Sequence, residues 1–215
     1  MEFFRNVDGA VIVEAIITVI QENTQYLSEV DGAIGDGDHG INMNKGVTLC
    51  QERLTGQQVD LATALNTLGR ILLTEIGGSM GPLYGTFFRE MAKATKDQEQ
   101  ITARVLDKML RAALVGVQNI GNAKVGDKTL IDTLVPAVEA YEAALDNGVS
   151  FRDALEVMKT AAEKGKDSTI DLVAKIGRAS RLGERSRGAL DAGATSCWLI
   201  LRAIADSSIQ LLLQQ

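Results

Sequence analysis

The sequence predicts an all-α protein, folded as a single domain over residues 1–215. Hydrophobic residues make up 46% of the chain, but aromatic residues only 4% and prolines only two positions. Ala and Leu are abundant, and such unbranched residues lose little rotamer freedom in a helix. Apolar residues recur at intervals of three and four, whereas no run of alternating β-branched residues is long enough for a strand. No linker, low-complexity stretch or internal repeat divides the chain.

The apolar spacing predicts about eight helices, and Leu65, Leu68 and Leu72 illustrate the register in one of them. Glycine-containing breaks separate the segments, because glycine lowers helix stability. The helices expected in the first half of the chain are Val7–Tyr26, Ile41–Leu54, Leu61–Ile76 and Leu83–Thr95.

The second half continues in the same pattern. Pro136 falls in the early part of an expected helix, where proline is tolerated. A loop rich in Gly and Arg, residues 177–193, precedes the last helix. The helices expected here are Ile101–Ile120, Leu130–Leu145, Phe151–Lys164, Ser168–Ile176 and Thr195–Leu213.

The loops between most of these helices are short, which implies that neighbouring helices run antiparallel. Glycine-rich loops follow alternate helices, at residues 32–40, 77–81, 121–126 and 177–193. In an up-and-down array, loops that follow alternate helices lie at the same end. We therefore expect these four loops to form one site.

The first of these loops is strongly acidic. Asp31, Asp36 and Asp38 fall within eight residues, among glycines, and the only histidine, His39, comes next. Carboxylates gathered on a tight loop repel one another unless a cation lies among them, and oxygen ligands suit Mg²⁺ bound together with phosphate. A solvated acidic turn is the plainer interpretation. An EF-hand is excluded, because Val47 stands where its final Glu is required.

Three other loops have a possible role in binding phosphate. Residues 77–81, Gly-Gly-Ser-Met-Gly, offer backbone N–H groups at a helix start. They also match the nucleophile elbow of serine hydrolases, but no strand precedes them and His39 comes before the serine. Residues 121–129 nearly match a P-loop, but the lysine comes one place late and no strand precedes it. A nucleotide-contacting loop of another kind and an ordinary polar connector are therefore equally consistent with these residues. Residues 178–187 hold four arginines, which suit either phosphate or a solvated basic loop that faces an acidic partner.

Charge and cysteine content limit the possible partners and compartment. The net charge is −6 and the pI is about 4.9, which disfavours nucleic acid and anionic membranes as partners. Cys50 and Cys197 form no metal-like pair, and there is no signal peptide, so we expect a reducing, cytoplasmic setting. No apolar run approaches the length of a membrane span.

Five ordered motifs together resemble the L subunit family of phosphoenolpyruvate-dependent dihydroxyacetone kinases, over nearly the whole chain. They are Asp31 with Gly35–Asn44, Gly77–Phe88, Gly126–Thr129, Gly177–Ser186 and Asp191–Ser196. Two motifs depart from the family pattern. Ser79-Met80 replaces (Ala/Thr)-Ser, which moves the hydroxyl one position earlier, and Ala192 replaces a proline.

The resemblance implies an eight-helix, up-and-down barrel with a nucleotide site at one end. ADP, transiently ATP, would be held there through two Mg²⁺ ions, and the metal ligands would be Asp31, Asp36 and Asp38. His39 and Arg178 would act in catalysis. The residues that would bind the nucleotide are His39, Gly40, Ile41, Asn42, Ser79, Met80, Gly121, Leu130, Arg178, Asp191, Ala192 and Gly193.

The family also implies a relay function and specific partners. A phosphohistidine-carrying M subunit of the phosphotransferase system would charge the resident ADP, and the γ-phosphoryl group would pass to dihydroxyacetone on a separate K subunit. The chain itself would form a homodimer. Two alternatives remain open: the nucleotide subunit of an ATP-dependent kinase for another small keto-sugar or sugar acid, and a nucleotide-binding coregulator of a transcription factor.

Overall fold

The computed structural model describes residues 2–214 and confirms the all-α architecture. Within that range there are nine α-helices. They are α1 (Ala10–Glu22), α2 (Thr24–Gly32), α3 (His39–Leu54), α4 (Leu61–Glu75), α5 (Met80–Thr95), α6 (Ala103–Gly121), α7 (Ile131–Asp146), α8 (Phe151–Ser168) and α9 (Ala192–Leu213). Short 3₁₀ segments cover Asn6–Asp8, Thr169–Asp171 and Arg178–Ser186.

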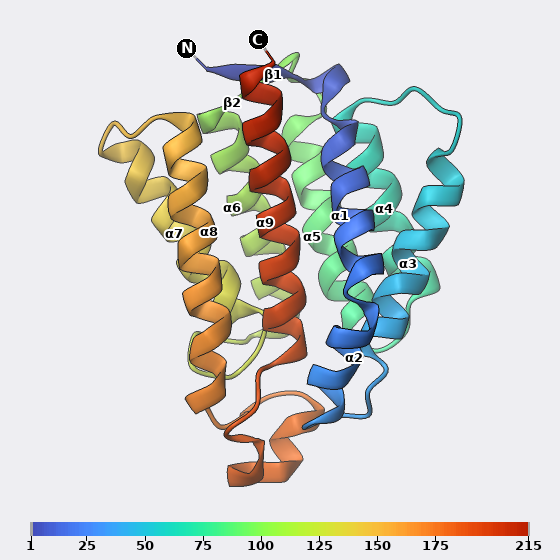
Figure 1. The fold of residues 1–215 in the computed structure, drawn as a ribbon, viewed down its shortest axis with the longest axis vertical. Coiled ribbons are helices and arrows are strands. Elements are labelled where there is room, and N and C mark those ends of the chain that lie inside the picture. Colours follow the sequence, from blue (N-terminus) through green and yellow to red (C-terminus); the bar gives the residue numbers. More distant parts are fainter. Residues whose placement is uncertain (1, 215) are drawn as a thin grey trace.

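The long helices form a closed, up-and-down barrel (Figure 1). From α3 to α9, each helix packs against the next along the chain, and α1 closes the ring by contacting both α9 and α3. The short α2 lies against α3 and α9 near one end. Because successive helices alternate in direction, α3, α5, α7 and α9 all begin at that same end of the barrel.

The interior is filled by the apolar faces that the sequence spacing predicts. Val13, Ile16 and Ile20 of α1 are fully buried, as are Leu65, Leu68 and Leu72 of α4. Phe87 and Phe88 of α5 meet edge to face, with ring centroids 5.0 Å apart. Helix α9 is long and apolar enough to cross a membrane, contrary to the expectation from sequence, but 67% of that stretch is buried. Most of it therefore packs into the core, against α1, α7 and α8.

Several predicted boundaries were wrong, for local reasons. The helix expected over Val7–Tyr26 is divided, because the Asn23 side chain donates to the Val19 carbonyl oxygen at 2.7 Å and ends α1. No α-helix covers 168–176. Ser168 and Thr169 donate their hydroxyls to the carbonyl oxygens of Gly165 and Lys166, both at 2.7 Å, and α8 ends there.

Helix starts and strands also differ from expectation. Helices α3, α5 and α9 begin two or three residues earlier than predicted, and Pro82 lies within the first turn of α5, where its missing N–H costs nothing. Two strands were not predicted: β1 (Phe3–Arg5) and β2 (Gln100–Thr102) pair antiparallel, with Phe4 opposite Ile101. Three residues are too few to show a two-residue alternation in sequence.

Candidate metal and phosphate site

The four glycine-rich loops lie together at one end of the barrel, as the alternation of helices predicts. In Figure 1 this is the lower end, opposite the described chain ends. The α2–α3 loop, the α4–α5 loop, the α6–α7 loop and the long α8–α9 connection all meet there.

Three carboxylates gather on the α2–α3 loop. Asp31 is half-buried in the last turn of α2, and Asp36 and Asp38 are exposed on the loop itself. One oxygen atom from each lies within 4.8 Å of the others. The loop folds back because Gly35 N–H donates to the Asp31 carbonyl oxygen at 2.6 Å and Gly37 takes a left-handed conformation, φ 77°. Oxygen ligands at this spacing fit hard divalent cations.

One cation of the protein itself reaches this cluster. Arg178, from the α8–α9 connection, forms an ion pair with Asp36, although 142 positions separate them in sequence. Both side chains are largely exposed, at 63% and 43%. The pairing brings the predicted catalytic arginine to the predicted metal ligands.

The helix N-termini around the loops are unusual in their capping. At the opposite end of the barrel, α4, α6 and α8 are each capped by a side chain, from Asp60, Thr102 and Ser150, whereas α1 is not. At the loop end, Asp191 caps α9, but within the part of the chain that the structure describes the N-cap residues of α3, α5 and α7 make no such bond. The first N–H group of α3 donates to Asp31 Oδ2 at 3.3 Å, and that of α7 donates to Thr129 Oγ1 at 3.2 Å. Uncapped N–H groups at positive helix ends are suited to bind phosphate.

The α4–α5 loop is open toward solvent. Gly78 is left-handed, with φ 71°, and a side chain added at Gly77 or Gly78 would meet nothing within 4 Å. Ser79 is exposed, and its side chain does not cap α5. Gly81, by contrast, lies against the backbone of Ile76 and Leu72, so that α5 starts close to the end of α4.

His39 begins α3 and is held in a chain of hydrogen bonds. Its Nε2 lies 2.9 Å from Ser196 Oγ, which lies 2.6 Å from the Tyr84 hydroxyl. Tyr84 donates in turn to the Gly193 carbonyl oxygen at 3.0 Å. Burial lowers the pKa of His39 to about 4, although Asp31 opposes the shift. A neutral imidazole therefore connects the acidic loop to the start of α9.

Gly40, next to His39, allows α3 to start against α2. A Cβ at this position would overlap the Thr24 carbonyl oxygen and would lie 2.6 Å from Ser28 Oγ. Neither atom can move without displacing the backbone of α2 or a buried hydroxyl. Glycine at this position thus fixes the distance between the start of α3 and the acidic loop. Ile41 and Asn42 follow in the first turn of α3; the side chain of Ile41 is 62% exposed.

The start of α9 adds a buried carboxylate. Asp191 caps the helix by accepting from Ala194 N–H at 2.7 Å. Burial raises its pKa to about 7, with the Ala194 hydrogen bond acting against the shift and Asp132 in favour of it. A Cβ on Gly193 would lie 3.4 Å from Leu130 N, so residues 191–193 border the α6–α7 loop. Gly121 closes α6 on the other side of that loop.

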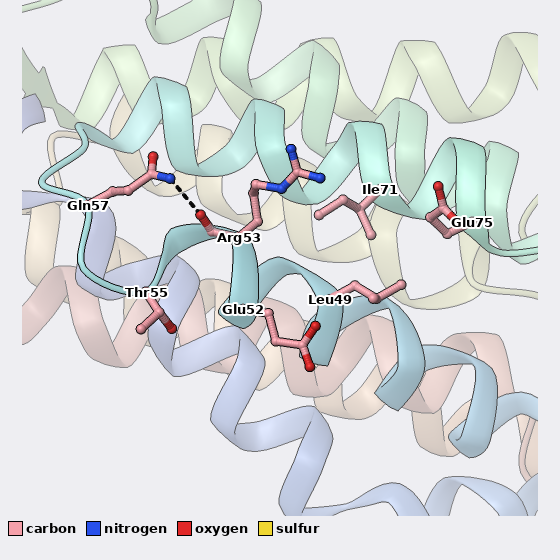
Figure 2. A pocket seen from close by; sticks show the side chains of 7 residues that line it. All are labelled: Leu49, Glu52, Arg53, Thr55, Gln57, Ile71 and Glu75. Atoms are coloured by element: carbon pink, nitrogen blue, oxygen red, sulfur yellow. Dashed lines mark hydrogen bonds between the residues drawn. The ribbon is translucent and has the colours of Figure 1, made fainter.

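A hollow elsewhere on the protein runs along the outside of α3 and α4 (Figure 2). It has a volume of about 570 Å³ and is lined by Leu49, Glu52, Arg53, Thr55, Gln57, Ile71 and Glu75. None of these residues belongs to the predicted site. A hollow of about 430 Å³ between α7 and α8 is similarly separate.

A family model described as the DAK2 domain matches residues 33–206. The chain belongs to the DAK2 domain family. It is 40% identical over 188 residues to the "PEP-dependent dihydroxyacetone kinase, ADP-binding subunit DhaL" of Escherichia coli, covering 87% of this chain and 90% of the relative. It is 41% identical over 191 residues to the corresponding subunit of kinase 1 of Listeria innocua, covering 88% and 90%.

Longer relatives contain the same domain. The L-erythrulose kinase of Pectobacterium atrosepticum is 32% identical over 199 residues, which cover 91% of this chain and 34% of the relative. Among solved structures, the dihydroxyacetone kinase of C. freundii superimposes with a TM-score of 0.72 at 27% identity, covering 94% of this chain. Its complex with AMP-PNP and Mg²⁺ gives 0.70 at 26% identity. This chain spans about a third of the length of those proteins.

Sequence reasoning missed the buried polar residues of this DAK2 domain. Tyr84 and Ser196 were noted only as parts of motifs, yet Ser196 Oγ contacts His39 Nε2 and Tyr84 in turn holds Ser196. Asp132 was not considered, and it accepts from Gly126 N–H at 2.5 Å and Thr129 N–H at 2.7 Å, which fixes the α6–α7 loop. Lys128 was weighed only as a misplaced P-loop lysine. A signal for Tyr84 was available, because a buried tyrosine hydroxyl needs a partner.

Proposed function

We propose that this chain is the ADP-binding, phosphoryl-transferring subunit of a dihydroxyacetone kinase. The observation that carries the proposal is the cluster of Asp31, Asp36 and Asp38 at the N-terminus of α3, whose N-cap residue, like that of α5, makes no side-chain cap bond. Carboxylates and N–H donors together suit a metal-bound diphosphate. The carboxylates bind the metal ions, and the phosphate oxygens bind both the metal ions and the N–H donors. The similarity to DhaL subunits over most of the chain supports the same conclusion.

Each part of the site has a proposed task. Asp31, Asp36 and Asp38 hold two Mg²⁺ ions. The backbone from His39 to Asn42, with that of Ser79 and Met80, binds the phosphates, and Gly121, Leu130 and Asp191–Gly193 surround the rest of the nucleotide. Arg178 neutralises phosphate charge with its planar fork. When bound, ADP supplies the phosphate that accepts and passes on the phosphoryl group, and Mg²⁺ offsets its charge.

The residues present fit this set of ligands. Three carboxylates within 4.8 Å of one another leave an excess negative charge that one exposed arginine does not balance. The phosphate loop needs no side-chain hydroxyl in this proposal, because backbone N–H groups at a helix start can bind phosphate and the Ser79 side chain does not cap α5. Phosphoryl transfer depends mainly on positioning and electrostatics, and both are supplied here without a nucleophilic side chain.

The donor and the acceptor belong to other chains in this proposal. The donor is a phosphohistidine protein, the M subunit of the phosphotransferase system, and the acceptor is dihydroxyacetone on a separate K subunit, in the cytoplasm. The names of the relatives, which specify a PEP- or PTS-dependent kinase, support this donor. A second candidate is an ATP-dependent kinase of another keto-sugar, which the 32% identity to an L-erythrulose kinase favours.

The nucleotide content of the purified protein distinguishes the two candidates. The protein is denatured in acid, and the supernatant is analysed by chromatography. We expect about one ADP per chain, retained through purification, and transfer to dihydroxyacetone that requires phosphoenolpyruvate with the phosphotransferase proteins and the K subunit. A nucleotide-free protein that turns over freely with added ATP would support the exchanging kinase and contradict the relay.

A further inference from the structure

Lys128 in the α6–α7 loop has two unusual properties that the proposed function does not explain. Its side chain is essentially fully buried, with 1% of the residue exposed, although lysine is among the residues most rarely buried. Its backbone is left-handed, with φ 63°, a conformation that non-glycine residues seldom adopt. An unusual backbone with a buried charge points to a specific role for this side chain.

The ammonium group of Lys128 has a complete set of partners. It donates to the carbonyl oxygens of Thr169 at 2.6 Å, Leu172 at 3.2 Å and Ala189 at 2.6 Å. An ammonium has three N–H donors and no acceptor, so none remains for a phosphate. The side chain of this residue therefore binds protein carbonyl oxygens and not phosphate, in agreement with the poor match to a P-loop.

The three carbonyl oxygens come from both ends of the α8–α9 connection. Thr169 and Leu172 lie where the chain leaves α8, and Ala189 lies where it returns to α9. The two ends are also joined by Gly188 N–H donating to the Ile170 carbonyl oxygen at 2.8 Å and Asp191 N–H donating to Thr169 Oγ1 at 3.0 Å. Residues 173–187 thus form a loop closed at its base, with Lys128 inside the base.

Asp127, next to Lys128 in the α6–α7 loop, holds one side of the 173–187 loop directly. Lys175 N–H donates to the Asp127 carbonyl oxygen at 3.1 Å, and Lys175 Nζ lies 3.3 Å from Asp127 Oδ1. Arg178 follows three residues later and reaches Asp36. A continuous path of contacts therefore runs from Lys128 through the loop base to the metal ligands.

We propose that Lys128 is a positioning residue, whose ammonium group closes the base of the 173–187 loop and so places Arg178 against the acidic cluster. This assignment rests on the proposed function for its consequence in nucleotide binding, but the closure of the loop can be tested without it. Three converging carbonyl oxygens match a compact ammonium and not a planar guanidinium, so arginine does not replace lysine here.

The test compares Lys128→Ala with a matched control, Lys159→Met. Lys159, on α8, also makes ion pairs, with Glu156 on the same helix and Asp206 on α9, but these residues are not part of the 173–187 loop. Trypsin measures loop closure directly, because the loop contains Lys175, Arg178, Arg181, Arg185 and Arg187. Cleavage is followed by mass spectrometry, and ADP affinity in the presence of Mg²⁺ by calorimetry.

We expect Lys128→Ala to raise cleavage within 175–187 and to weaken ADP binding, each by about tenfold or more, since hydrogen bonds to a charged group are lost. Ethylammonium, which can occupy the space left by the side chain, should restore both, and guanidinium should restore neither. Lys159→Met should match the wild type. A folded Lys128→Ala protein with wild-type cleavage and affinity would overturn the proposal. So would raised cleavage and weakened ADP binding that ethylammonium does not restore.

A second measurement needs no variant and applies even where Lys128→Ala fails to fold. In the wild type without nucleotide, the amides of Lys175, Gly188 and Asp191 should be protected from hydrogen exchange, because the base of the loop is closed. Exchange there at the rate of an open loop would refute the role of Lys128. A wild-type protein that binds no ADP would instead refute the proposed function, and the cleavage and exchange results would still decide this inference.

Discussion

We expect Arg178→Ala to lower turnover strongly and stability only slightly. The Arg178 side chain is 63% exposed, and its partner Asp36 is 43% exposed. Exposed ion pairs contribute about 1 kcal/mol or less to stability. In a domain of this size, 1 kcal/mol corresponds to a change in Tm of roughly 2–4 °C. We therefore expect the Tm of the variant to stay within that range of the wild-type value.

The effect on turnover should be far larger. An arginine that neutralises a transferring phosphoryl group is worth about 10³-fold or more in rate, which corresponds to about 4 kcal/mol. The assay is transfer to dihydroxyacetone at saturating partner subunits, with Tm measured by calorimetry on the same samples. Arg178→Lys should recover little, because it keeps the charge and loses the fork.

Arg187→Ala is the control for this prediction. Arg187 lies in the same loop, but it donates to Glu184 at 3.0 Å and to the Asp171 carbonyl oxygen, so its contacts stay within the α8–α9 connection. The loss of Arg187, like that of the exposed Arg181 or Arg185, should mainly change how tightly the partner subunit binds. The partner concentration needed for half-maximal turnover should rise, and the salt dependence of partner binding should change. Equal losses of turnover in the Arg178 and Arg187 variants, with unaltered partner affinity, would refute the division of roles.

Three further predictions concern the metal, the start of α3 and pH. Asp38→Ala should abolish ADP retention, and calorimetry that finds unchanged affinity with Mg²⁺ present would contradict the metal assignment. Gly40→Ala should lower Tm by several degrees, since an added methyl in a packed contact costs about 1–3 kcal/mol; Gly32→Ala, whose Cβ would meet only an atom 3.9 Å away, should not. In nucleotide-free protein, Asp191 keeps a proton up to about pH 7 that the unfolded chain releases near pH 3.8. The free energy of unfolding should therefore fall as pH rises between those values. The Tm of Asp191→Asn, compared with that of the wild type, should rise progressively from pH 5 to pH 8. A Tm difference that is constant with pH would show that the Asp191 carboxyl does not titrate in this range.

The parts of the fold that depend on local pattern could be predicted from the sequence. The periodicity of Leu65, Leu68 and Leu72 identified α4 almost to its ends, and the alternation of loops placed Asp31 and Arg178 at one end. The break at Asn23 was missed because asparagine ends a helix only when its side chain finds a free carbonyl oxygen, here that of Val19. Such competition is not visible in apolar spacing.

The supporting residues of the site could not be predicted, for a different reason. Nothing in the sequence pattern indicates a buried role for Lys128, because the carbonyl oxygens that it binds lie 41 to 61 positions later in the chain. Ser196 and His39 are separated by 157 positions. A pattern in one sequence identifies residues that carry chemistry, but it carries no information about which distant backbone groups will satisfy them.

The uncapped helix starts at the loop end have a consequence for the lifetime of the protein in the cell. Each missing cap costs a helix about 1 kcal/mol. The crowded carboxylates add repulsion, so the empty protein is under tension at one end. A ligand that supplies the missing contacts stabilises the folded state by about 2.7 kcal/mol when its concentration is a hundred times Kd. Under the proposed function, chains that never acquire nucleotide and magnesium would therefore unfold more often and be degraded first.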